Sequence, residues 1–236
     1  MERGLYMAVS GALAAERSLD VTADNIANAN TAGYKAKTPV FSEVLSDAGG
    51  VGLSQVAHVR NAVDAGPGVL RETGRPLDLA VEGDGYLVVG TDHGLALSRS
   101  ERGQVSADGY LVTVDGFPIL DGDGHAISLP TTGEAVEVSG GGVVSVGGVA
   151  GGEIGIVNVD EAQLEAAGSR FVAPSSAWRD AQGSSSVVGG ALEYSNTNAV
   201  RGMVDVVRAS RAFEMLTKMV ENFGEIDRRT SELGKR

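Results

Sequence analysis

Two amphipathic segments at opposite ends of the chain constrain its fold more than any other feature. Near the N-terminus, apolar or small residues recur at alternating steps of three and four from Leu5 to Ile26. Near the C-terminus, the same spacing runs from Val206 to Phe223. This repeat places its members along one stripe of an α-helix. The sequence therefore predicts a helix at each end, each with an apolar stripe to bury.

The two predicted stripes differ in bulk. The N-terminal stripe is mostly small and comprises Leu5, Ala8, Ala12, Ala15, Leu19, Thr22 and Ile26. The C-terminal stripe comprises Val206, Ala209, Phe213, Leu216, Val220 and Phe223, and it is widened by Met203, Val207, Met219 and Ile226. Burying a large aliphatic side chain contributes about 1.5–3 kcal/mol, whereas ordering one residue costs about 1–2 kcal/mol. The alanine-rich helix should therefore not be stable alone, and it should pair with the other helix or with other molecules.

The residues beside these helices indicate where each one ends or begins. Asn28 and Asn30 tolerate a left-handed backbone, and Gly33 follows them, so the first helix should end near residues 28–30. Ser195 or Asn196 is predicted to cap the start of the second helix.

Between the helices, the periodicity changes to that of β-strands. Residues 77–82 alternate with a period of two, and Asp-Gly dipeptides recur at short spacing from Asp108 onward. We expect an all-β domain over residues 74–174, with a short helix or loop at 164–172. Further strands are expected at 86–89, 110–114, 117–120, 135–138, 143–146 and 154–159.

The sequence thus predicts an α+β fold in five parts. Residues 1–35 form the N-terminal helix and a turn, and residues 36–73 form an extended linker. The all-β domain at 74–174 is followed by a Ser- and Gly-rich linker at 175–191. Residues 192–236 form the C-terminal helix, and the two terminal helices are expected to build a coiled-coil-like core.

Composition excludes several classes of function. The 236-residue chain has a formal net charge of -12, which disfavours binding to nucleic acid phosphates. It contains no cysteine, so disulfides and thiolate metal sites are excluded. Neither a membrane helix nor a cleavable signal peptide is predicted, because no apolar run has the required length.

No catalytic, cofactor-binding or metal-binding residue is predicted, so no cofactor and no enzyme activity are expected. The Asp121–His125 segment resembles a calcium loop, but Ala126 and Thr132 stand where that loop needs Gly and Glu. The three histidines lack metal-ligand spacing. The carboxylates of Asp78, Glu82 and Asp84 are better read as turn residues than as an acid/base pair, because glycines flank them.

Three motifs in fixed order carry a family resemblance. They read NIANANTAGYK at residues 25–35, RPLDLAVEGDGYL at 75–87, and a segment that begins LEYSNTNAVRG within 192–227. Together they resemble the flagellar rod and hook proteins of bacteria. A hook protein would need further β domains. The segment at 97–105 departs from the distal rod pattern, keeping only Arg99 and Gly103, which favours the proximal rod type and leaves the distal type as the alternative.

The resemblance implies a structural subunit of the flagellar basal-body rod in the periplasm. It implies export by the flagellar type III apparatus and assembly, with copies of itself and related rod proteins, into a helical tube that transmits torque and encloses the export channel. No nucleic acid partner or membrane insertion is expected. A secreted β-rich binding or adhesion protein is the alternative from another class, but it leaves the paired helical stripes unexplained.

Two sets of residues are predicted to carry this function. The subunit interface is expected to comprise Leu5, Ala12, Leu19, Ile26, Met203, Val206, Phe213, Leu216, Val220 and Phe223. The signature turn is expected to comprise Asn25, Asn28, Thr31, Gly33, Tyr34 and Lys35. Gly33 should allow a positive φ that redirects the chain, and Tyr34 should pack its ring.

Overall fold

A computed structural model describes residues 2–46, 53–130, 134–181 and 183–233. The chain divides into two compact units. The first, here called the helical unit, comprises Met1–Ala27, Lys37–Asp64 and Thr197–Arg236. The second, the β unit, comprises Asn28–Ala36 and Ala65–Asn196. The helix–β–helix order confirms the predicted α+β class.

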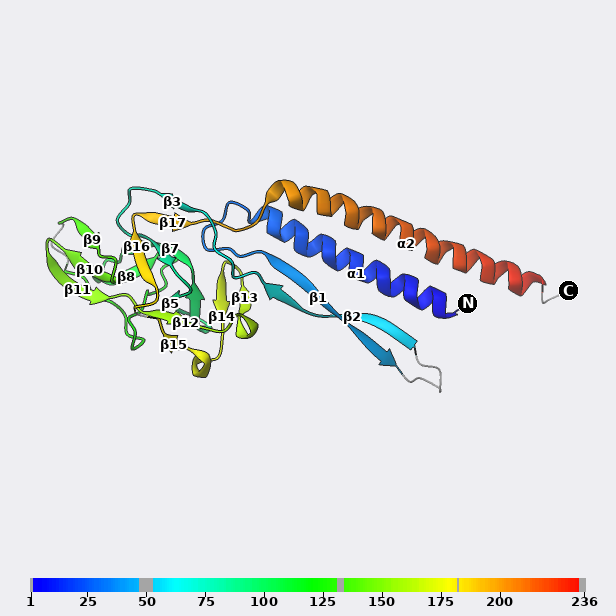
Figure 1. Cartoon of the computed structure of the whole chain (residues 1–236), viewed down its shortest axis with the longest axis horizontal. Helices are drawn as coiled ribbons and strands as arrows, with labels where there is room; N and C mark the ends of the chain where they lie inside the picture. The colour runs from blue at the N-terminus through cyan, green and yellow to red at the C-terminus, as the bar shows by residue number, and fades with distance from the viewer. Residues whose placement is uncertain (1, 47–52, 131–133, 182, 234–236) are drawn as a thin grey trace. The chain divides into compact units, whose positions relative to one another are not determined.

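The helical unit is built around the long helix α1 (Glu2–Ala27), which contacts the second long helix, α2 (Ala199–Leu233). Figure 1 shows the two helices side by side. They run antiparallel, because Gly4 lies against Phe223 whereas Ile26, at the other end of α1, lies against Gly202. The two predicted stripes therefore meet within one chain.

A β-hairpin completes the helical unit. Strand β1 (Lys37–Ser46) pairs antiparallel with β2 (Leu53–Val63), and both strands contact α1. The expectation of an extended linker over residues 36–73 was therefore wrong, although its residues 47–52 lie outside the described ranges. Pro39 and a register shift between Val40 and Phe41 interrupt the strand pattern, which explains why the sequence did not reveal it.

Both helix ends follow from local hydrogen bonds. Helix α1 ends at Ala27, as predicted, and the N–H of Thr31 donates to the carbonyl of Asn28 at 3.0 Å. The cap of α2 is Asn198, whose Oδ1 accepts the N–H of Arg201 at 3.0 Å. The prediction of Ser195 or Asn196 was wrong, because these residues precede the helix and belong to the β unit.

The β unit contains several small antiparallel sheets. A six-stranded sheet has the order β13-β14-β6-β5-β12-β15, and a four-stranded sheet has the order β16-β4-β7-β8. The strands of the first are β5 (Tyr86–Thr91), β6 (Gly94–Ser98), β12 (Ile156–Asn158), β13 (Glu165–Ala167), β14 (Arg170–Val172) and β15 (Arg179–Asp180). Those of the second are β4 (Asp78–Glu82), β7 (Ser100–Val105), β8 (Leu111–Thr113) and β16 (Ser186–Gly189).

The remaining strands form two smaller sheets. One contains β9 (Val136–Val138), β10 (Val143–Val146) and β11 (Val149–Glu153), and the other pairs β3 (Leu70–Glu72) with β17 (Ala191–Glu193). Two short 3₁₀ helices, η1 (Glu161–Gln163) and η2 (Ser175–Ala177), lie in the connections. The apolar core gathers residues from several strands: Leu79, Val81, Leu87, Leu111, Ile119, Ile127, Leu129, Val144, Val146, Ile154, Ile156, Ala181 and Val187.

The structure corrects the predicted limits of the β region. Residues 164–172 contain the whole hairpin β13–β14 instead of a helix or loop. Residues 175–191 contain β15 and β16 and are not a linker, because Val187 belongs to the core. Residues 192–198 precede α2, and Leu192 is fully buried in β17. The short strands β15 and β16 lie among Ser and Gly residues, so composition alone did not distinguish them from a linker. Residues 117–120 form isolated bridges and no strand.

Candidate functional site

The residues of the two predicted apolar stripes, which include the predicted interface, divide into two groups. Phe213, Leu216, Val220 and Phe223 are half-buried, as are Val206 and the α1 residues Leu5, Ala12, Leu19 and Ile26. Two glycines of α1 receive the large side chains of α2. A Cβ atom on Gly4 would lie 2.9 Å from Cζ of Phe223, and one on Gly11 would lie 3.2 Å from Cδ1 of Leu216. Part of the stripe is therefore an internal helix contact.

The other group remains exposed. The exposed fractions of Met203, Val207, Met219 and Ile226 lie between 42% and 58%. Helix α1 also exposes Tyr6, Met7, Val9 and Leu13. Exposed apolar groups of this size are typical of surfaces that contact another molecule.

The signature turn begins in the helical unit with Asn25. Its amide forms two hydrogen bonds with Lys37: Oδ1 accepts the backbone N–H and Nδ2 donates to the carbonyl, each at 2.8 Å. The Nζ atom of Lys37 lies 3.0 Å from Oδ2 of Asp24. Asn25 therefore fastens the end of α1 to the start of β1, and it acts as a structural residue.

The rest of the signature turn lies in the β unit. Thr31 Oγ1 is 3.2 Å from Oδ1 of Asn28, which holds the turn after the helix. Gly33 has a φ of +74°, as predicted, and its N–H donates to the carbonyl of Glu193 at 2.9 Å. Tyr34 is buried, with 2% of its surface exposed. The turn is thus docked against the strand that leads to α2.

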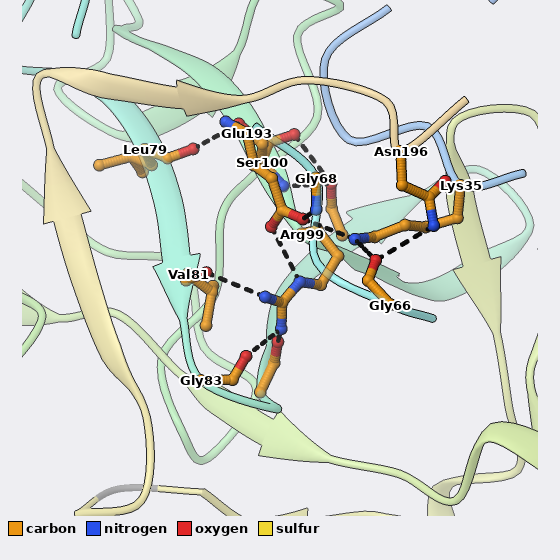
Figure 2. Close-up of polar contacts among 12 residues, drawn as sticks. Lys35, Gly66, Gly68, Leu79, Val81, Gly83, Arg99, Ser100, Glu193 and Asn196 are labelled. Carbon is orange, nitrogen blue, oxygen red and sulfur yellow. Dashed lines mark hydrogen bonds and ion pairs between the residues drawn. The ribbon is translucent and has the colours of Figure 1, made fainter. Parts of the chain in front are cut away.

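Lys35 ends in a buried ion cluster with Glu193 and Arg99 (Figure 2). Lys35 Nζ lies 2.5 Å from Glu193 Oε1 and 2.6 Å from the carbonyl oxygen of Gly66. Arg99 Nε donates to Glu193 Oε2 at 3.0 Å. The backbone N–H of Gly68 also donates to Oε1, at 2.7 Å. One carboxylate therefore joins two cations from distant parts of the sequence.

Arg99 connects this cluster to the second sequence motif. Its Nη1 donates to the carbonyls of Gly83 and Gly85 at 2.6 and 2.5 Å, and its Nη2 donates to the carbonyl of Val81 at 3.0 Å. Lys35 comes from the first motif and Glu193 from the third. The three motifs that are separate in the sequence therefore meet at one ion cluster inside the β unit.

The electrostatics of the cluster favour the ionised carboxylate. Burial raises the pKa of Glu193, but the charge of Arg99 and the hydrogen bonds from Lys35 and Gly68 outweigh burial and place the pKa below its ordinary value. An acceptor surrounded by several donors is also satisfied as a hydrogen-bonding group. The cluster is therefore suited to holding chain segments together, and its charged groups are engaged with one another.

Sequence reasoning identified Lys35 but missed Glu193 and Arg99 as its partners. A usable signal was present, because each lies within or beside a segment singled out by the family resemblance. Asn196 was noticed only as a helix cap. Its Oδ1 accepts the N–H of Ala36 at 2.8 Å and its Nδ2 donates to the Gly66 carbonyl at 3.1 Å.

The Asp121–His125 segment, which was compared with a calcium loop, forms a hydrogen-bonded turn. Asp121 Oδ1 accepts the backbone N–H groups of Asp123 and His125 at 3.0 and 2.7 Å. The side chains of these three residues offer ligand atoms within 4.8 Å of one another. The backbone bonds of Asp121 already explain the arrangement as an Asx-type turn.

Three family models match the chain. The model of the flagella basal body rod protein matches residues 5–35, and that of the flagellar basal body rod FlgEFG protein C-terminal region matches residues 188–233. The model of the flagellar hook protein FlgE/F/G D1 domain matches residues 80–146. All three describe rod or hook proteins of the bacterial flagellum.

Curated relatives match over nearly the whole chain. The flagellar basal-body rod protein FlgF of Rhizobium meliloti (strain 1021) is 33% identical, with 99% of each chain covered. FlgF of Caulobacter vibrioides is also 33% identical, over 100% of this chain and 99% of the relative. FlgG of Bacillus subtilis is 30% identical, over 96% and 97% respectively.

The chain belongs to the flagellar basal-body rod protein family. It is accordingly a structural rod subunit of the flagellar basal body, in keeping with the names of its relatives. Within the described residues, no helix is long and apolar enough to cross a membrane.

Proposed function

We propose that this rod subunit is of the proximal, FlgF type and that it assembles through the exposed apolar residues of its two terminal helices. In this proposal the helices of successive subunits pack into a helical tube that encloses the export channel and transmits torque. The observation that carries it is the exposed apolar group on α2, where Met203 and Val207 are 58% and 50% exposed.

The helix pair supports assembly in physical terms. Its internal contact already uses Leu216 and Phe223, which pack against Gly11 and Gly4. Met203, Val207 and Met219 are not covered by that contact, so their burial must come from another molecule. Head-to-tail contacts between copies generate open helical assemblies when they do not close into a ring. The partners in this proposal are copies of the chain and related rod proteins.

The choice of FlgF over FlgG rests on the extent of the matches. The alignments with FlgF of Rhizobium meliloti and Caulobacter vibrioides span 242 and 250 residues. Those with FlgG of Bacillus subtilis and Agrobacterium fabrum span 255 and 258 residues. Because this chain has 236 residues, these two FlgG alignments require more gaps than the two FlgF alignments, whereas FlgF of Salmonella typhimurium also aligns over 254 residues. FlgG remains the second candidate, since the identities are similar.

The proposal includes export through the flagellar type III apparatus. A subunit that passes through a narrow channel travels unfolded and folds at its destination. The helical unit suits this route, because its two helices come from opposite ends of the chain and pair only after both ends have arrived. Neither nucleic acid binding nor membrane insertion forms part of the proposed function.

The experiment is complementation in bacteria that lack either their proximal or their distal rod gene. Restored motility in the first strain alone would support the FlgF type, and restored motility in the second alone would support the FlgG type. Each strain should also be fractionated, because a rod subunit must copurify with basal bodies. Absence of the wild-type chain from the basal bodies of both strains would contradict the proposed function.

The interface is tested with a double variant, Met203→Glu/Val207→Glu. Placing charges on an apolar contact should cost several kcal/mol per interface, on the order of the cost of burying unpaired charged groups. The variant should retain its helix content by circular dichroism but fail to enter basal bodies. Glu214→Gln/Glu221→Gln, at exposed polar positions of the same helix, is the matched control. Leu216→Asp would not discriminate, because Leu216 also packs against α1 within the chain.

A further inference from the structure

A pocket of about 610 Å³ opens in the β unit beside the ion cluster. Its walls come from the segment after β2, the β4–β5 turn and the β12–η1 connection, and Arg99 and Glu193 contribute to its lining. At about 30 Å³ per water molecule, its volume equals that of roughly twenty waters. This is far more space than a single bound ion needs.

Carboxylates surround this pocket. Glu82, Asp84 and Glu161 line it and are exposed, and within the described part of the chain their side chains form no hydrogen bond or ion pair. The fourth, Asp160, uses Oδ1 to accept the N–H of Ala162 at 3.0 Å. Three acidic side chains are therefore available to a cationic group, and their charge opposes an anionic ligand.

A second and independent feature is the buried side chain of Tyr86. Only 3% of Tyr86 is exposed, and it lines the same pocket. Its ring packs edge-on against Phe171 at 5.8 Å and lies 5.5 Å from the guanidinium carbon of Arg99. Its hydroxyl makes no hydrogen bond to any described residue. A tyrosine hydroxyl that lines a pocket and has no described protein partner can offer a hydrogen bond to an occupant.

The titration of Tyr86 agrees with this orientation. The pKa of its hydroxyl is raised to about 12, chiefly by burial, with a further contribution from the negative charges of Glu161, Glu193 and Asp84 and an opposing one from Arg99. These carboxylates all line the pocket. The hydroxyl therefore lies close enough to these pocket carboxylates to interact with their charges.

The arrangement favours an organic cation over a metal ion. Among the described residues, only Asp121, Asp123 and His125 bring three acidic or imidazole ligand atoms within 4.8 Å of one another, and they lie outside this pocket. The rim carboxylates are thus too dispersed for one small ion. The apolar side chains of Ala65, Pro67 and Leu70 also line the pocket and suit the aliphatic stem of a long basic side chain.

We propose that this pocket is a docking site for an arginine or lysine side chain presented by a neighbouring rod subunit. The cation would be held between the carboxylates of Asp84 and Glu161, with the Tyr86 hydroxyl facing the incoming chain. The proposal rests on the proposed function, because that function supplies the neighbouring subunits. It adds a polar contact of the β unit to the apolar contact of the helices.

The binding test uses the full chain and a peptide probe, N-acetyl-Gly-Arg-Gly-amide, followed by amide NMR. The control peptide replaces arginine with citrulline, which keeps the shape and removes the charge. We expect saturable shifts at residues 82–86 and 158–161 with the arginine peptide and none with the citrulline peptide. Asp84→Asn/Glu161→Gln should weaken binding roughly tenfold, because two partly exposed ion pairs of about 0.7 kcal/mol each together contribute about 1.4 kcal/mol. Tyr86→Phe should weaken it about threefold to tenfold.

The matched control is Asp92→Asn/Glu165→Gln, which removes two exposed charges of the same unit away from the pocket. It should bind the peptide like the wild type. Equal shifts with the citrulline peptide, or undiminished binding by Asp84→Asn/Glu161→Gln, would overturn the proposal. A lysine peptide, N-acetyl-Gly-Lys-Gly-amide, should bind at the same residues.

The assembly test separates this inference from the proposed function. In the complemented strain, the wild type and Asp92→Asn/Glu165→Gln should enter basal bodies, and Asp84→Asn/Glu161→Gln should enter at a reduced level. If all three enter equally, the docking site is wrong and the rod function stands. If even the wild type is absent, the rod function fails, and the peptide titration still decides whether the pocket binds a basic side chain.

Discussion

The Nζ atom of Lys35 lies 2.5 Å from Oε1 of Glu193, and the two residues are 158 positions apart in the chain. Only 1% and 3% of their side chains are exposed. Lys35 directly follows the turn after α1, and Glu193 directly precedes the segment that enters α2. The ion pair therefore joins the segment that follows α1 to the segment that precedes α2, within the β unit.

The first prediction concerns removal of the shared carboxylate. Glu193→Gln leaves the buried cations Lys35 and Arg99 without their counter-ion, and breaking a buried ion pair in this way costs about 3–5 kcal/mol. We expect the free energy of unfolding of the β unit to fall by that order, measured by denaturant titration with the fluorescence of Trp178, the only tryptophan. Glu137→Gln, at an exposed position of β9, should change it by less than about 0.5 kcal/mol.

The second prediction is a dependence of stability on pH. The pKa of Glu193 is lower in the folded chain than its ordinary value of 4.5. The carboxylate therefore contributes its full stabilisation above pH 4.5 and loses it as the pH falls toward the folded-state pKa. The difference in unfolding free energy between wild type and Glu193→Gln should be constant from pH 5 to 7 and then narrow by up to about 1.4 kcal/mol per pH unit. A difference that stays constant down to pH 3 would contradict this role.

The third prediction concerns Gly33 and separates the free-energy cost of a positive φ from the cost of a steric clash with a neighbouring residue. This residue has a φ of +74°, and a Cβ atom would lie 3.0 Å from the carbonyl oxygen of Ser100. Gly74 has a nearly equal φ of +72° and no heavy atom within 4 Å of the corresponding position. Gly74→Ala should therefore lose only the roughly 1–2 kcal/mol of a left-handed residue. Gly33→Ala should lose more, and Gly33→Val more again, because a β-branched side chain is less tolerant of this conformation.

Denaturant titration of these three variants provides the measurement. Equal losses for Gly33→Ala and Gly74→Ala would show that close packing against Ser100 adds nothing. In the complemented strain, Gly33→Val should also reduce motility, because the signature turn would no longer dock against the β unit.

The fourth prediction concerns the glycines of the helix pair. Gly11 admits the side chain of Leu216, so Gly11→Leu should force α1 and α2 apart and lower the melting temperature of the helical unit. Gly224 of α2 has no heavy atom within 4 Å of its added Cβ. Gly224→Ala should therefore stabilise the helix by about 0.5–1 kcal/mol. Circular dichroism at 222 nm measures both effects, and a stabilising Gly11→Leu would rule out the close packing.

Local patterns predicted those parts of the fold that local forces determine. The apolar period predicted both helices, and the glycine after the asparagines predicted the positive φ at Gly33. Strands β4, β5 and β10 were predicted from alternating or apolar runs bounded by turns. In the helix pair, Gly4 and Gly11 looked like interruptions of the stripe, because their role depends on Phe223 and Leu216 of a distant helix.

The ion cluster could not be predicted for a related reason. Arg99 and Glu193 are 94 positions apart. The family resemblance marks the segments that contain them, but no local pattern pairs one residue with the other. The hairpin β1–β2 was hidden by Pro39 and a register shift, and β16 was hidden among Ser and Gly. A fragment that ended at residue 190 would lack both Glu193 and Leu192, which are buried in the β unit.

The division of the chain into units has a mechanical consequence. The backbone passes between the helical unit and the β unit four times, at 27/28, 36/37, 64/65 and 196/197. Three of these crossings lie close to Asn196, whose side-chain amide hydrogen-bonds to the backbone of both Ala36 and Gly66 within the β unit. A force that acts between the units is therefore shared by four backbone connections, whereas a single linker would carry all of it.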